Sequence, residues 1–163
     1  MTLNRKVLAV VLSLLSVFWI FFIFSNSAET ASESNDKSYD VVEIIIEKVL
    51  REDLESKSKA EISIINNFIR KLAHFSEFAV LSLFAFLSFW AWNLKSFLRY
   101  FLPVTAAFFV ACTDEIIQYF VPGRACRFTD VLIDTGGAVF LIIVVVSLKL
   151  IFLKIKSIRG NDE

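Results

Sequence analysis

Ionisable side chains cluster in three short stretches of an otherwise apolar chain, and their types could support proton transfer or anion binding. The first stretch, "RKLAHFSEF", places His74 three residues before Glu77, so a helix would present both on one face. A histidine beside a carboxylate can act as a general base or as a nucleophile. Arg70 and Lys71 precede the pair and could hold a phosphate or a carboxylate.

The second and third stretches are the segment "DEIIQYFVPGRACRFTD" and the residues just after it. Asp114 and Gln118 are four residues apart, so a helix would present both on one face. Asp130 and Asp134 have the same spacing, and the turn "VPGR" lies between the two pairs. The predicted ligand-binding residues are Arg70, Lys71, His74, Glu77, Asp114, Glu115, Gln118, Arg124, Arg127, Asp130 and Asp134.

These residues admit catalytic and structural interpretations as well. The catalytic candidates are His74, Glu77, Asp114 and Glu115, with the arginines stabilising a developing negative charge. As structural groups, the histidine and glutamate would join helices, and the acids would pair with the loop arginines. One histidine with several acids could hold a divalent metal ion, but we expect no metal and no cofactor because the arginines would repel a cation.

The composition is that of a membrane protein. Of the 163 residues, 56% are hydrophobic, above the roughly 45–50% typical of soluble domains, and 18 are phenylalanines. The formal net charge is zero, which gives no indication of nucleic-acid binding. Cys112 and Cys126 show no metal-binding spacing, and we expect both thiols to be free.

Four runs are long and apolar enough to cross a hydrocarbon core about 30 Å thick as helices. The first run is longer than the apolar core of a signal peptide, so we interpret it as a retained helix. The predicted fold is all-α, a single domain over residues 1–163 that forms an integral membrane bundle of four transmembrane helices. The predicted spans are residues 7–24, 72–92, 100–120 and 131–153.

The distribution of basic residues near the span ends predicts that both termini are cytoplasmic. Eight basic residues would then share the cytoplasmic side, whereas Arg70 and Lys71 oppose this orientation. The eight are Arg5, Lys6, Lys95, Arg99, Lys149, Lys154, Lys156 and Arg159.

Residues 25–71 would form an extracytoplasmic loop. Its first part, residues 25–40, is polar and typical of a solvated loop. The following segment, "VVEIIIEKVLREDLE", has the periodicity of a short amphipathic helix. That helix would lie on the outer leaflet or pack on the protein itself.

With this topology, the strongly polar residues of the last three spans, apart from the terminal lysines, would lie at the outer helix ends. At 1.5 Å per residue, their stripes extend only about 6–10 Å inward from those ends. We therefore expect a shallow, water-accessible pocket on the extracytoplasmic side. Charges are tolerated there because they face one another and water instead of lipid.

Two of these stretches resemble the motifs of the VanZ-like family, named for an accessory protein of teicoplanin resistance. "RKLAHFSEF" is similar to its first motif and "TDEIIQYFVPGRACRFTDVLIDTGG" to its second, while "FSNSAETAS" is similar to its serine-rich stretch. Phe78 stands where tyrosine is common, and Asp134 stands where many members carry asparagine. The resemblance implies a bacterial inner-membrane protein of the cell envelope, with a glycopeptide antibiotic among its possible partners.

Three functional classes remain open at this point. A binding module would hold a membrane lipid, a lipid-linked wall precursor or a glycopeptide antibiotic. The four basic side chains of the site, Arg70, Lys71, Arg124 and Arg127, would contact it. An enzyme would act on a lipid-linked substrate through the histidine and the acids. A proton-coupled transporter would need polar groups across the whole membrane, and the inner halves of the spans, such as "FLIIVVVSL", offer none.

Overall fold

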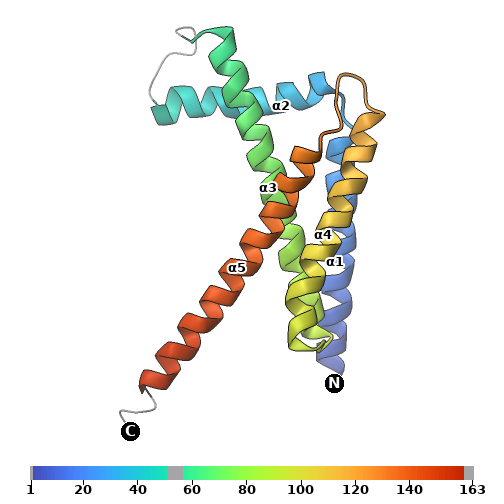
Figure 1. Cartoon of the computed structure of the whole chain (residues 1–163), viewed down its shortest axis with the longest axis vertical. Helices are drawn as coiled ribbons and strands as arrows, with labels where there is room; N and C mark the ends of the chain where they lie inside the picture. Colours follow the sequence, from blue (N-terminus) through green and yellow to red (C-terminus); the bar gives the residue numbers. More distant parts are fainter. Residues whose placement is uncertain (1, 51–56, 160–163) are drawn as a thin grey trace.

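The protein is a bundle of long helices capped at one end by a shorter helix (Figure 1). The computed structural model describes residues 2–50 and 57–159, and within those residues there is no strand. The elements are α1 (Leu3–Ser27), α2 (Ala31–Ile44), the π-helical segment η1 (Ile45–Leu50), α3 (Lys59–Ala91), α4 (Ser96–Tyr119) and α5 (Phe128–Arg159). Four of them, α1, α3, α4 and α5, are long and apolar enough to cross a membrane, which confirms the all-α prediction of four spans.

Two helices, α2 and α3, begin ten or more residues earlier than predicted. The α3 helix starts at Lys59, and its 33 residues give a length of about 50 Å, more than the bilayer core of about 30 Å requires. The expectation of a solvated loop over residues 25–40 was wrong outside residues 28–30, because α1 continues to Ser27 and α2 begins at Ala31. The described residues therefore make most of the connection between the first two spans helical.

Capping boxes fix both early starts. At the start of α2, the Thr30 backbone N–H donates to the Glu33 carboxylate at 2.9 Å, and the Glu33 N–H donates back to the Thr30 hydroxyl at 3.4 Å. At the start of α3, the Ser58 N–H donates to the Glu61 carboxylate at 2.8 Å, and the Glu61 N–H donates back at 3.3 Å. Each box satisfies backbone donors that the first helical turn leaves open.

The α2 helix lies across the N-terminal part of α3 (Figure 1). Ser38 and Val42 are buried on its inner face, whereas Tyr39, Val41 and Ile44 are exposed. One face of the helix therefore packs on the protein, as one of the two alternatives predicted. The last part of the predicted amphipathic helix, residues 51–55, lies outside the described residues.

Small residues and inter-helix hydrogen bonds hold the long helices together. The hydroxyls of Ser13 in α1 and Ser88 in α3 lie 2.8 Å apart, and Trp19 donates its indole N–H to the Glu77 carbonyl at 2.9 Å. Close packing of small side chains is the usual driving force between helices in lipid. The buried apolar cluster consists of Ile23, Phe78, Leu81, Ala107, Ala111, Val131 and Ala138.

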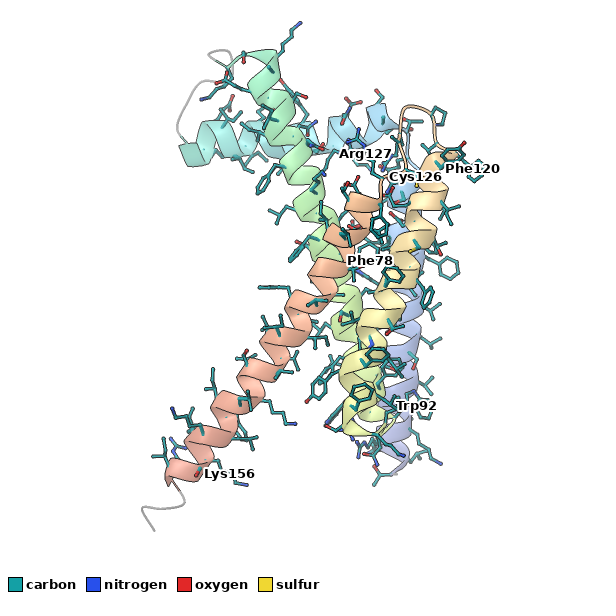
Figure 2. The ribbon with its side chains drawn as sticks, in the orientation of Figure 1. Phe78, Trp92, Phe120, Cys126, Arg127 and Lys156 are labelled. Atoms are coloured by element: carbon teal, nitrogen blue, oxygen red, sulfur yellow. The ribbon has the colours of Figure 1, made fainter. Side chains whose placement is uncertain are left out.

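The two ends of the bundle differ in chemistry. Both termini lie at one end, where α5 has diverged from the other helices (Figure 1). There Arg5 donates to the Ala91 and Trp90 carbonyls at 3.1 and 2.9 Å, which satisfies the C-terminus of α3. Figure 2 places Trp92 and Lys156 at this end, and Cys126 and Arg127 at the opposite end, near α2. The α2 end carries the predicted polar residues.

Candidate functional site

A small cavity of about 40 Å³ lies where α3, the end of α4 and the start of α5 meet. Each helix contributes residues one turn apart, which is why the spacing seen in the sequence brings them to one place. Asn67 and Ile133 complete the wall. Seven of the eleven predicted site residues line this cavity: Arg70, Lys71, His74, Glu115, Gln118, Asp130 and Asp134.

The other four predicted residues lie around the same point. Glu77 and Arg124 line a neighbouring cavity of about 200 Å³ beneath α2, which also has Arg70 and His74 in its wall. Arg127 is exposed, and it lines a larger hollow of about 760 Å³. Arg70 is common to all three cavities.

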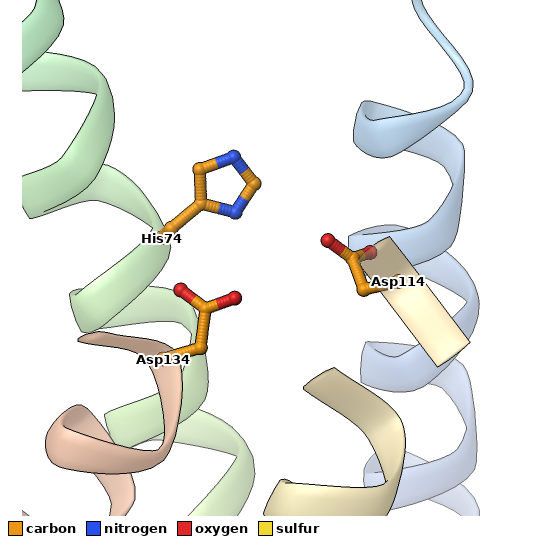
Figure 3. Close-up of side chains that lie close together, drawn as sticks. All are labelled: His74, Asp114 and Asp134. Atoms are coloured by element: carbon orange, nitrogen blue, oxygen red, sulfur yellow. The ribbon is translucent and has the colours of Figure 1, made fainter. Parts of the chain in front are cut away.

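Asp114, the eleventh residue, is fully buried. Its Oδ2 accepts a hydrogen bond from Gln118 at 2.9 Å, and the same Gln118 amide lies 3.3 Å from the Ser27 hydroxyl. The side chains of His74, Asp114 and Asp134 point into one shared space between three helices (Figure 3). Each offers a ligand atom within 4.8 Å of the others, so these three residues could hold a metal ion.

His74 and Glu77 lie side by side without a hydrogen bond between them. The His74 Nδ1 and the Glu77 Oε2 are 3.8 Å apart, too far for one. Asn26 in α1 holds the glutamate instead, by donating to its Oε1 at 2.8 Å. The histidine and glutamate share a helix face as predicted, but the glutamate is fixed by a different helix.

The acids and arginines are also paired differently from the structural interpretation. In the part of the chain that the structure describes, neither Asp114 nor Glu115 forms an ion pair with a loop arginine. Glu115 accepts from the Arg127 backbone N–H at 2.6 Å, and the ion pair of this region joins Lys71 to Asp130 at 3.0 Å. Within the described residues, Arg70 and Arg124 donate to amide and carbonyl oxygens and not to carboxylates.

Arg124 lies with its guanidinium against the end of α1. It donates to the Glu29 carbonyl at 2.8 Å and to the Asn26 carbonyl at 3.2 Å. Burial lowers the pKa of Arg124 from its ordinary value, and the positive charge of Arg70 lowers it further, against the opposing effect of nearby acids. The two arginines are therefore close enough to repel each other.

Each of these two arginines has a buried nitrogen whose hydrogen-bonding capacity is unused. Arg70 donates to the Asn35 side chain of α2 at 3.2 Å, but its Nε has no partner among residues 2–50 and 57–159. The Nη1 of Arg124 is likewise buried without a partner in that part of the molecule. Buried charged donors normally have acceptors, so an acceptor from outside the chain fits here.

Residues from α1 and α2 that the sequence analysis did not assign to the site complete its wall. Asn26, Glu29 and Asn35 each bond a predicted site residue, and Lys37 forms an ion pair with Glu29. The signal that could have found them is the Thr-x-x-Glu pattern at Thr30. That pattern marks the start of a helix. The polar stretch after Thr30 is therefore a helix, and in the structure it lies across α3.

The comparisons with known proteins agree with the motifs. The family model described as VanZ/LLP1 matches residues 10–152, which include all four long helices over most of their length and the whole site. Searches of curated proteins and of solved structures found no match. The helices and the site residues thus fall within one continuous match, and the chain belongs to the VanZ/LLP1 family.

Proposed function

We propose that this membrane protein binds the phosphate group of an anionic lipid or lipid-linked precursor between Arg70 and Arg124. The observation that carries the proposal is the pair of buried guanidinium nitrogens without partners within the described residues. Both arginines line the cavity of about 200 Å³, and their like charges repel across it. A phosphate would accept from both and would neutralise that repulsion.

The rest of the cavity wall supports a lipid phosphate over a free carboxylate. Val41, Ile69 and Ala73 give it an apolar side, suited to the part of a lipid that adjoins its headgroup. Of the two acids in the wall, Glu29 is paired with Lys37, and Glu77 accepts from Asn26 through Oε1 while its Oε2 has no partner within the described residues. Glu29 is therefore satisfied by a lysine, and an incoming anion would compete for the arginines mainly with Glu77.

The proposed location is the outer face of a bacterial inner membrane, with both termini in the cytoplasm. The basis is the positive-inside rule. Arg5, Arg99 and Lys149 belong to the end of the bundle opposite the site, where Arg5 bonds the end of α3 and Lys149 lies 3.3 Å from the Tyr100 hydroxyl. In this orientation the cavity would meet outer-leaflet lipids, wall precursors of the cell envelope and glycopeptide antibiotics such as teicoplanin.

Native mass spectrometry of the purified protein from nanodiscs of phosphatidylglycerol or phosphatidylcholine tests the proposal. We expect bound phosphatidylglycerol in the wild type and its loss in Arg70→Gln. Truncating one side of a buried charge pair costs about 2 kcal/mol or more, which is about 30-fold in Kd. Arg124→Gln should act similarly, with circular dichroism to check folding because Arg124 also bonds the end of α1.

Arg127→Gln is the matched control, because its side chain is exposed and lines a different hollow. It should retain the lipid. Equal lipid retention in Arg70→Gln and Arg127→Gln would refute the proposed site. Binding of a glycopeptide antibiotic in place of lipid, lost in the same variants, would keep the site but replace its ligand.

Catalysis on a lipid phosphoester is the second candidate, favoured by the position of His74. This residue lines both the small cavity and the headgroup cavity, within 3.8 Å of Glu77. It could remove a proton from a water molecule that attacks phosphorus, while an acid protonates the departing alcohol. His74→Gln should then abolish release of the alcohol and leave lipid retention unchanged.

A further inference from the structure

Three residues that are far apart in the sequence meet inside the bundle. His74 comes from α3, Asp114 from α4 and Asp134 from α5. One nitrogen or oxygen of each lies within 4.8 Å of the others, and Figure 3 shows all three side chains directed into the same space. They form a group of one imidazole and two carboxylates, which we call the inner trio.

The spacing of the inner trio suits a single ion. Zinc binds imidazole nitrogen and carboxylate oxygen at about 2.0–2.2 Å in tetrahedral geometry, so its ligand atoms lie about 3.3–3.6 Å apart. Ligand atoms within 4.8 Å of one another reach this spacing if the side chains move together by about 1 Å. The ligands come from three separate helices, so an ion here would tie α3, α4 and α5 together.

A second observation points to a ligand in this space. Asp114 is fully buried, and its Oδ1 has no hydrogen-bond partner within the described portion of the chain. Its Oδ2 accepts from Gln118 at 2.9 Å, which fixes the orientation of the carboxylate. Hydrogen bonds of this kind commonly orient the carboxylate ligands of metal ions.

The electrostatics of Asp134 call for a cation. This residue is 2% exposed, and it lines the small cavity together with Glu115 and Asp130. Carboxylates gathered in a buried place repel one another unless a proton or a cation lies between them. Asp130 is paired with Lys71, whereas Asp114 faces Asp134 within the inner trio.

We propose that the inner trio binds one divalent transition-metal ion, such as Zn²⁺ or Mn²⁺, through His74, Asp114 and Asp134. One imidazole with two carboxylates suits these ions, whereas Mg²⁺ prefers oxygen ligands alone. The sequence led us to expect that nearby arginines would repel a metal ion. Arg124 does line a cavity together with His74, although its guanidinium donates to the carbonyls of Asn26 and Glu29. The two carboxylates of the trio would have to outweigh that positive charge.

The metal site goes beyond the proposed lipid binding and does not depend on it. His74 is shared by the trio and the headgroup cavity, so an ion on the histidine would lie beside a bound phosphate. The arginines belong to the lipid site and the two aspartates to the metal site. Variants of each set therefore test the two proposals separately.

The test uses the full-length protein in detergent, equilibrated with Zn²⁺ or Mn²⁺ alone. Bound metal is measured by mass spectrometry after removal of free ion, and thermal unfolding is followed with and without the ion. We expect one ion per wild-type chain and a higher Tm in its presence. Loss of an outer-shell group weakens metal binding about 10–100-fold, so Asp134→Asn, which removes a ligand, should weaken it about 100-fold or more.

Asp40→Asn is the control, because Asp40 is exposed on α2 and neither lines the small cavity nor belongs to the inner trio. It should bind metal as the wild type does. If Asp134→Asn fails to fold, His74→Gln provides the same test from a partly exposed position. Wild-type metal content equal to that of Asp134→Asn and His74→Gln would overturn the proposal and leave a proton shared between the two aspartates.

Discussion

The crossing of α3 and α5 at Gly137 can be tested by adding a single carbon atom. A Cβ built on Gly137 overlaps the Phe75 carbonyl oxygen and lies 2.9 Å from the carbonyl carbon. These are backbone atoms of a helix, so no side-chain rotation can relieve the overlap. The crossing sets the position of the inner trio, because His74 precedes Phe75 and Asp134 lies one turn before Gly137.

Gly136 provides a matched control on the same helix. A Cβ there meets only the Phe75 ring at 3.8 Å, which is ordinary contact. Both substitutions gain about 1 kcal/mol of helix propensity, so this gain cancels when they are compared. Overpacking costs about 1–3 kcal/mol, and because the obstacle is backbone we expect the upper end. Gly137→Ala should therefore be about 3 kcal/mol less stable than Gly136→Ala.

Thermal unfolding of the two variants in the same detergent measures this difference. For a chain of this size, 1 kcal/mol corresponds to about 2–4 °C, so Gly137→Ala should unfold about 6–12 °C below Gly136→Ala. Gly136→Ala should match or slightly exceed the wild type. If Gly137→Ala unfolds at or above the temperature of Gly136→Ala, the close contact between α3 and α5 is wrong.

Three further predictions concern the connections around the site. The Thr30 backbone and side chain lower the pKa of Glu33, so the capping box stabilises α2 above the ordinary pKa of 4.5 and this stabilisation is lost as the pH falls below it. Amide exchange at the start of α2 should then become faster in the wild type. Glu33→Gln keeps the cap without titrating, so it should show no such increase. Gly123 has a φ of 78°, so Gly123→Ala should lower the free energy of unfolding by about 1–2 kcal/mol in denaturant titrations, and an unchanged midpoint would contradict the turn. Cys126 is exposed beside the site, so a membrane-impermeant maleimide should label it in intact cells. The Cys126→Ser control should stay unlabelled. Labelling only after lysis would show that the protein has the opposite orientation in the membrane.

Hydropathy and helical spacing predict the long helices and the residues that meet at their ends. A lipid environment leaves long apolar runs no other regular structure, and residues four apart must share a helix face. The predicted span began at residue 72 although α3 begins at Lys59, because hydropathy detects only the apolar part of a helix. Its polar start is marked by the Ser58–Glu61 capping box, a local signal independent of hydropathy.

The partners of the site residues depend on tertiary packing that spacing along one helix cannot give. Asn26 reaches Glu77 because α1 packs against α3, and Asn35 reaches Arg70 because α2 folds back across α3. These pairs lie on different helices, so helical spacing along the sequence cannot predict their contacts. The inner trio is of the same kind, since its members are 40 and 20 positions apart and meet only through the crossing of three helices.

The most direct test of the central claim is an experimental structure of the protein in phosphatidylglycerol nanodiscs. Lipid binding predicts phosphate oxygens within about 2.7–3.2 Å of guanidinium nitrogens from both Arg70 and Arg124, in the cavity beneath α2. A structure in which lipid phosphate lies elsewhere, with these two arginines bonded to acids of the chain itself, would contradict it.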